Sequence, residues 1–165
     1  MNYIKITTAD IANGIGVRVT LWCSGCAHHC PGCQNPQTWD VAAGNSFVED
    51  TMQELLNLIR PNYIRGLTFS GGDPLFVQNR LIVGYICERV RKEFGDAKDI
   101  WMWTGYEWDD IKDWDHLKYV DVLVDGPYVE TQRDISLPWA GSRNQRVIDV
   151  KQSMKKNEIV LWKEN

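Results

Sequence analysis

The residues most able to do chemistry are cysteines, because four of the chain's five lie in the stretch CSGCAHHCPGC, from Cys23 to Cys33. A structural zinc site is one interpretation, with all four thiolates as ligands or with His28 or His29 replacing one. An iron–sulfur cluster is the other. Zinc sites usually divide their ligands into two pairs separated by a longer loop, which this stretch lacks. Spacing alone leaves both interpretations open.

A cluster bound by three of these cysteines has a specific use. If only Cys26, Cys30 and Cys33 bind a cubane cluster, one iron has no protein ligand and is free to bind a substrate or cofactor. The later motif TFSGGDP supplies a candidate partner, since two glycines let the backbone approach a ligand closely and Asp73 adds an acceptor for a positive group. By itself this motif is more often an ordinary turn than a ligand site.

The elements that must position these residues alternate between strands and helices, which predicts an α/β fold with a mostly parallel sheet. A capping box at Ser46 and Glu49 and a stop at Pro61 bound the first expected helix, and Gly95 closes the second. Helices are expected over residues 45–59, 79–94 and 106–114, and strands over 3–6, 17–22, 65–70, 99–105, 119–126, 145–150 and 158–162.

The length of 165 residues predicts a single domain over residues 1–165. A closed eightfold barrel usually needs about 250 residues, so the expectation is a partial, open β/α barrel. Three expected strands end before Gly71, Gly105 and Gly126. Their loops should therefore share the carboxyl-end rim, where sheets of this type hold ligands.

Composition excludes several classes of partner. The formal net charge of −4 gives no basic footprint, which argues against nucleic acid and anionic membranes as partners. The amino terminus lacks a signal-peptide core, and no segment approaches a membrane span. We therefore expect a cytoplasmic protein, in a reducing compartment where clustered thiols bind metal or do redox work.

The cysteine motif C-x-x-x-C-x-x-C followed by the GGDP loop resembles the radical S-adenosylmethionine superfamily. The blocks DIANGIGVRVTLWCSGCAHHCPGCQNPQTW, LTFSGGDPL, DIWMWTGY, VDVLVDGPYV and WAGSRNQRVIDV are similar to the glycyl-radical activases of the anaerobic (class III) ribonucleoside-triphosphate reductases. These blocks extend over nearly the whole chain in the order found in that family.

The resemblance implies that a 4Fe–4S cluster on Cys26, Cys30 and Cys33 binds S-adenosylmethionine through its open iron. Reductive cleavage of the cofactor then gives methionine and a 5′-deoxyadenosyl radical, which takes a hydrogen atom from a backbone glycine of the reductase. The implied partners are the large subunit of the anaerobic reductase and a low-potential electron donor such as a flavodoxin. A different small radical enzyme, either another glycyl-radical activase or a deazapurine synthase, and a non-catalytic zinc-binding module are the alternatives.

The resemblance also implies cofactor contacts. The amino-acid end of the cofactor is expected at Gly71, Gly72 and Asp73. The implied adenine site is the backbone of Gly32, Cys33 and Gln34, although Gly32 stands where many superfamily members carry an aromatic residue. The remaining implied contacts are Thr104 and Asp125, for the ribose or elsewhere on the cofactor, and Asn144, for cofactor or partner.

Several conspicuous residues have a plainer interpretation. Cys23 is either a small buried hydrophobic residue or a substitute ligand, and Cys87 belongs to the core. His28 and His29 are expected to shape the cysteine loop. Trp101 and Trp103 alternate on one face of a strand and should pack there. An exposed docking surface for the reductase is expected at Trp39, Trp108 and Trp139.

Overall fold

The computed structural model describes residues 1–164, which form a seven-stranded sheet in the order β3-β1-β2-β4-β5-β6-β7. The strands are β1 (Asn2–Asp10), β2 (Val17–Cys23), β3 (Asn45–Ser46), β4 (Ile64–Gly71), β5 (Asp99–Trp103), β6 (Val122–Asp125) and β7 (Arg146–Asp149). The helices are α1 (Glu49–Ile59), α2 (Arg80–Phe94), α3 (Trp108–Ile111) and α4 (Val150–Lys156).

The sheet is mixed, which corrects the expectation of a mostly parallel one. Strands β2, β4, β5 and β6 are parallel to their neighbours in that row. Pairing is antiparallel for β1 with β2, β1 with β3, and β6 with β7. The α/β class and the unclosed sheet agree with the sequence, and the parallel centre keeps four carboxyl ends on one rim.

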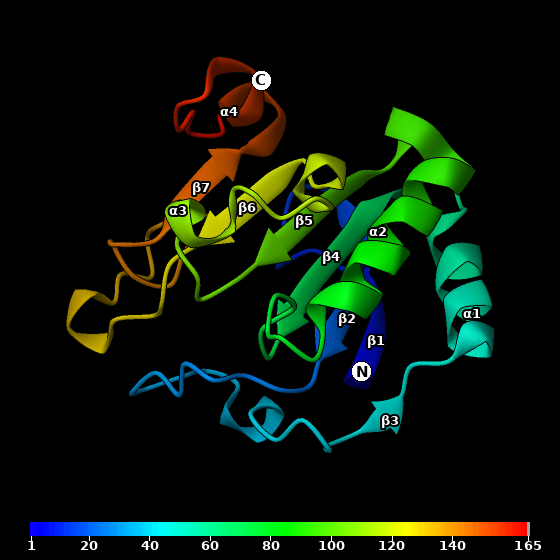
Figure 1. The fold of residues 1–165 in the computed structure, drawn as a ribbon, viewed down its shortest axis with the longest axis horizontal. Helices are drawn as coiled ribbons and strands as arrows, with labels where there is room; N and C mark the ends of the chain where they lie inside the picture. Colours follow the sequence, from blue (N-terminus) through cyan, green and yellow to red (C-terminus); the bar gives the residue numbers. More distant parts are fainter. Residues whose placement is uncertain (165) are drawn as a thin grey trace.

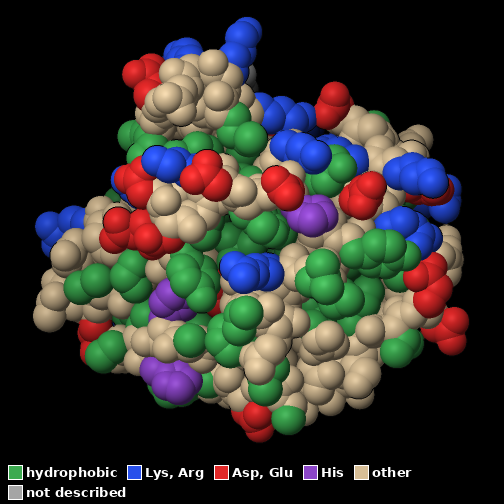
Figure 2. Space-filling model, in the orientation of Figure 1, with side chains coloured by type: hydrophobic (Ala, Val, Ile, Leu, Met, Phe, Trp, Pro, Cys, Tyr) green, Lys and Arg blue, Asp and Glu red, His purple; other side chains and the backbone are tan. Residues whose placement is uncertain are grey.

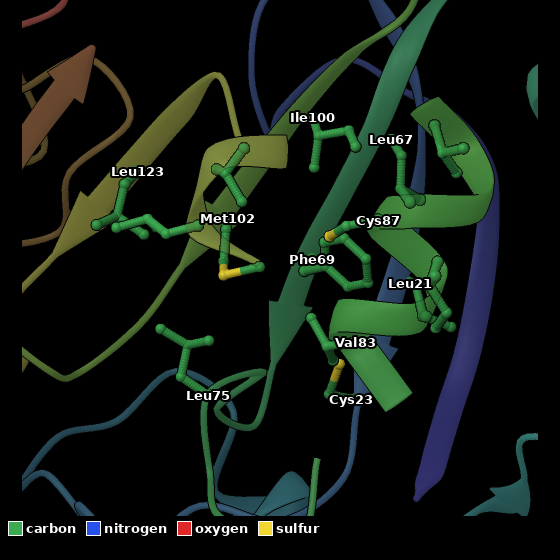
Figure 3. Close-up of a cluster of buried hydrophobic side chains, with 14 of the residues drawn as sticks. Leu21, Cys23, Leu67, Phe69, Leu75, Val83, Cys87, Ile100, Met102 and Leu123 are labelled. Atoms are coloured by element: carbon green, nitrogen blue, oxygen red, sulfur yellow. The ribbon is translucent and has the colours of Figure 1, made fainter. Parts of the chain in front are cut away.

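Helices α1 and α2 lie side by side against one face of the sheet (Figure 1). The periodicity of α1 explains its position, since Met52, Leu55, Leu56 and Ile59 are all buried. Side chains from β2, β4 and β5 meet these helices in one apolar core, part of which is shown in Figure 3. Helix α2 ends at Gly95, whose φ of 56° is in the left-handed region, as expected for a helix stop.

Two local predictions fail. Ser46 does not cap α1: it lies in β3, and its hydroxyl donates to the Asn2 side chain. The hydroxyl of Thr51 instead accepts from the Val48 backbone N–H at 3.5 Å. The expected strand over residues 158–162 is reduced to an isolated bridge between Ile148 and Leu161, and helix α4 was not expected.

No helix within residues 1–164 is both long enough and apolar enough to cross a membrane.

Candidate functional site

A cavity of about 550 Å³ opens at the carboxyl ends of the parallel strands. The cysteine loop (residues 24–35) forms one wall, following β2 beneath the end of β4 (Figure 1). Gly71, Gly105 and Gly126, which follow or end three other strands, also line this cavity. The rim predicted from strand-ending glycines is therefore present, and the cysteines open onto it.

The GGDP loop (Gly71–Pro74) is joined to the cysteine loop through the main chain. The backbone N–H of Gly72 donates to Cys23 O, and that of Asp73 donates to Gly25 O, both at 2.8 Å. A Cβ at Gly71 would lie 2.9 Å from Cys23 O, and one at Gly72 would lie 2.6 Å from Gly25 O. The two glycines are thus required by the approach of one loop to the other, whatever ligand binds beside them.

The Asp73 carboxylate is nearly buried, at 2% exposure, and is surrounded by protein donors. It accepts from His28 Nε2 at 2.8 Å, from Thr104 Oγ1 at 2.9 Å, and from the backbone N–H groups of Gly105 at 2.9 Å and Leu75 at 2.8 Å. The bond to Asp73 raises the pKa of His28. Asp73 therefore lines the cavity, and its oxygens accept hydrogen bonds that hold the neighbouring loops in place.

Cys26, Cys30 and Cys33 are half-buried free thiols on the cavity wall. Burial is the main cause of the raised pKa of the Cys26 thiol. In residues 1–164, no three His, Cys, Asp or Glu side chains are grouped closely enough to hold a single metal ion. Three thiols spread along a roomy cavity fit a four-iron cubane, which takes one thiolate per iron and would leave one iron facing the open space.

Cys23 and Cys87 are separate from this group. Both are 0% exposed and belong to the apolar core, as the sequence indicated for Cys87 and as one of the two interpretations of Cys23 proposed. Cys23 lies beside Val83 of α2 in Figure 3, on the face of the sheet that the helices cover. Burial raises the pKa of both thiols, which disfavours the thiolate that a metal requires.

The other predicted cofactor contacts divide into two groups. Gln34 and Thr104 line the cavity together with Cys33, Gly71, Gly72 and Asp73. Asp125 is 0% exposed, and its carboxylate is held by Arg146 Nε at 3.0 Å and by the Trp108 backbone N–H at 2.8 Å. That carboxylate is therefore engaged in the fold. The Asn144 side chain is likewise occupied, donating to Pro127 O at 2.8 Å.

Gly32 has a structural reason for lacking a side chain. Its φ is +72°, and a Cβ there would lie 2.6 Å from the carboxylate of Glu130, in the 3₁₀ helix η4 (Glu130–Gln132). The positive φ is the main reason, because side chains rarely adopt that backbone conformation and the exposed Glu130 side chain could move aside.

The tryptophans agree with the sequence in the strand β5 but not in the expected docking surface. Trp108 is only 6% exposed, so its predicted place in a docking surface is wrong. Trp39 is half-buried against the ring of His29, at a centroid distance of 4.6 Å. Trp139 lines the cavity, where its carbonyl accepts from Trp103 Nε1 at 2.9 Å. The strand alternation that predicted Trp101 and Trp103 on one face is confirmed by their stacking, at 5.8 Å between centroids.

Comparison with known proteins identifies relatives over almost the entire chain. A family model described as a 4Fe-4S single cluster domain matches residues 12–148. An anaerobic ribonucleoside-triphosphate reductase-activating protein of Enterobacteria phage T4 is 46% identical over 147 residues, 89% of this chain and 93% of the relative.

Bacterial proteins of the same name give a similar result. The one from Haemophilus influenzae is 43% identical over 88% of this chain and 96% of its own length. The one from Escherichia coli K12 is 42% identical over 89% of this chain and 97% of its own length. The chain therefore belongs to the 4Fe-4S single cluster domain family and, within it, to the family of anaerobic ribonucleoside-triphosphate reductase-activating proteins.

Proposed function

We propose that the chain is a radical S-adenosylmethionine enzyme that forms a glycyl radical on an anaerobic ribonucleoside-triphosphate reductase. The observation that carries this proposal is the shared cavity: Cys26, Cys30 and Cys33 line the same space as the GGDP loop. A cluster bound there would face the part of the rim best suited to hold a small cofactor.

When bound, a reduced 4Fe–4S cluster supplies the electron that cleaves the sulfonium C–S bond of S-adenosylmethionine, and the resulting 5′-deoxyadenosyl radical takes a hydrogen atom from a reductase glycine. The chain itself would bind the cluster, orient the cofactor and shield both from water. The thiolates of Cys26, Cys30 and Cys33 would hold the cluster at the cavity wall. Trp103 and Trp139 wall the cavity and would exclude water from a reactive radical.

The proposed cofactor contacts follow the cavity wall. The backbone of Gly71 and Gly72 would bind the methionyl end, Thr104 the ribose, and Cys33 and Gln34 the adenine; all five residues line the cavity. Gly32 is kept as a backbone contact of the adenine, while Asp73 acts by holding the loops that bear these groups. Asp125 and Asn144 are proposed to stabilise the fold around the site rather than to contact the cofactor, because their side chains are bonded within the protein.

The proposed partners are the large subunit of an anaerobic ribonucleoside-triphosphate reductase and a low-potential electron donor such as a flavodoxin. Acidic and basic side chains are interspersed on the face seen in Figure 2, in keeping with a protein partner rather than nucleic acid. We place the protein in the cytoplasm, where its free thiols would stay reduced. We also propose that residues 1–165 act as one domain, with the unclosed sheet serving as a partial barrel.

The test is an electron paramagnetic resonance experiment under anaerobic conditions. The chain is reconstituted with iron and sulfide, reduced, and mixed with S-adenosylmethionine and the candidate reductase. We expect stoichiometric methionine and 5′-deoxyadenosine together with a glycyl-radical doublet on the reductase. Cys30→Ala is the control and should give neither. Cofactor cleavage without a glycyl radical would reject the proposed target, and stoichiometric zinc with no cluster would reject the radical chemistry.

A further inference from the structure

His28 stands between the first two proposed cluster ligands, Cys26 and Cys30, yet its contacts are with other loops. Its Nε2 lies 2.8 Å from Asp73 Oδ2, and its ring meets Tyr106 edge-on, with centroids 4.7 Å apart. The first contact joins residues 45 positions apart in the chain. The side chain therefore ties the middle of the cysteine loop to the loops that follow β4 and β5.

The loop after β5 is shaped around this imidazole. A Cβ at Gly105 would lie 2.7 Å from both Cγ and Nε2 of His28, so a side chain at position 105 would displace the ring. The φ of Gly105 is not in the left-handed region, and alanine could adopt its backbone conformation. Space for His28 is thus the structural reason that this position lacks a side chain.

Asp73 is itself held rigidly. The Thr104 hydroxyl and the backbone N–H groups of Gly105 and Leu75 all donate to it. A buried carboxylate with this many donors has little freedom to move, so the fourth donor, His28, is bonded to a fixed point. Together, His28, Asp73, Thr104 and Gly105 connect the loops after three neighbouring strands.

We propose that these four residues form a latch, in which His28 is a positioning residue that sets the cysteine loop against the GGDP loop before any cluster binds. This inference rests on the proposed function, because the two loops are those proposed to hold the cluster and the methionyl end of S-adenosylmethionine. The His28 side chain is not among the proposed contacts of the cluster or the cofactor; through Asp73 it fixes the separation between their two binding walls.

His29 provides a matched control in the same loop. It is exposed, packs on Trp39 and makes no bond to Asp73. His28→Asn removes the latch, since the asparagine amide is one bond shorter than the imidazole arm. His28→Gln restores a donor at the same number of bonds from Cβ. His29→Asn changes the neighbouring histidine identically, and asparagine tolerates the φ of 45° at that position.

Two measurements decide the matter. In the metal-free full chain, amide hydrogen exchange across residues 24–35 should be about tenfold faster in His28→Asn, the size expected for losing a hydrogen bond to a charged group. His28→Gln and His29→Asn should stay near wild type. In the reconstituted, reduced protein, the S-adenosylmethionine concentration that half-converts the cluster's paramagnetic spectrum should rise about tenfold in His28→Asn only.

Gly105→Ala tests the same contact from the other side. It should speed exchange in the cysteine loop of the wild-type chain, but add little in the His28→Asn background, because the ring that it displaces is already gone. Additive effects of the two substitutions, or equal behaviour of His28→Asn and His29→Asn, would overturn the latch. A wild-type chain that binds the cluster but not S-adenosylmethionine would instead overturn the proposed function. The hydrogen-exchange experiment would still test the latch, because it uses the metal-free chain.

Discussion

The two faces of the central strands differ sharply, although alternate residues of the same strands form them. On the face covered by α1 and α2, the residues from β2, β4 and β5 are apolar and 0% exposed: Val19, Leu21, Leu67, Phe69, Ile100 and Met102. The opposite face carries polar and aromatic side chains: Arg18, Thr20, Thr68, Trp22, Trp101 and Trp103. At the carboxyl ends of the strands this face opens into the cavity. The helix-covered face forms the hydrophobic core, and the opposite face lines the candidate site.

Arg18 explains why the second face is hollow only at one end. Its guanidinium is 0% exposed, forms an ion pair with Asp99 at 2.6 Å, donates to Thr68 Oγ1 at 2.7 Å and lies over the Trp101 ring at 5.3 Å. A buried charge is tolerated when it is paired and hydrogen-bonded in this way. Arg18 and its partners fill the amino-terminal half of that face, which confines the cavity to the rim.

The comparison predicts that binding and stability can be lost separately. Cys30→Ala should abolish cluster binding, measured as iron and sulfide per chain after anaerobic reconstitution. The free energy of unfolding of the metal-free chain should change by no more than about 0.5 kcal/mol, because the thiol is a half-buried loop side chain. Cys87→Ala, on the opposite face, should leave cluster binding unchanged and lower the free energy of unfolding, because Cys87 is fully buried in the core. A cluster retained in Cys30→Ala would show that the ligand assignment is wrong.

The largest loss of stability is expected on the helix-covered face. Phe69→Ala removes a fully buried ring and should lower the free energy of unfolding by about 3–5 kcal/mol, measured by denaturant titration of the metal-free chain. Leu81→Ala on α2 is the control, since Leu81 is 73% exposed and its loss should cost about 0.5 kcal/mol or less. Equal effects at the two positions would contradict the division between the faces.

Asp125 tests where the site ends. Asp125→Asn weakens the bonds to Arg146 and to the Trp108 N–H, and it should destabilise the chain by about 2 kcal/mol. The iron content and the affinity for S-adenosylmethionine should stay at wild-type values, because the carboxylate points into the fold. Asp109→Asn, at an exposed carboxylate, is the matched control. A large loss of affinity for S-adenosylmethionine with an unchanged free energy of unfolding would show that Asp125 contacts the cofactor.

The sequence could predict the site because its signals are local. Cysteine spacing, the paired glycines of the GGDP loop and the glycines that end or follow strands each lie within a few residues, and together they locate the rim. The contacts that shape the site are between distant segments: the His28 side chain with Asp73, and the Gly72 N–H with the Cys23 carbonyl. Single-residue patterns do not encode which segments meet, so these contacts were not foreseen.

The errors in the fold have a similar origin. The apolar run over residues 159–162 is typical of a strand, and it does bond to β7, but only through an isolated bridge between Ile148 and Leu161. Trp162 at its end packs against Trp101, with ring centroids 5.0 Å apart. Helix α4 has a local signal in the sequence, the capping residue Asp149, whose Oδ1 accepts from the Gln152 N–H at 2.9 Å. The antiparallel pairing of β7 depends on its partner β6, and periodicity alone cannot give strand direction.

Cys23 gives the smallest expected effect, because its side chain belongs to the core and its backbone to the candidate site. Its side chain is in the core, while its carbonyl accepts from the Gly72 N–H in the connection between the loops. Cys23→Ala keeps that carbonyl and removes only one buried sulfur, so unfolding should become easier by about 1 kcal/mol. Iron, sulfide and the cluster spectrum should match wild type. A variant that folds but binds less iron would make Cys23 a cluster ligand and place four thiolates, rather than three, around the cavity.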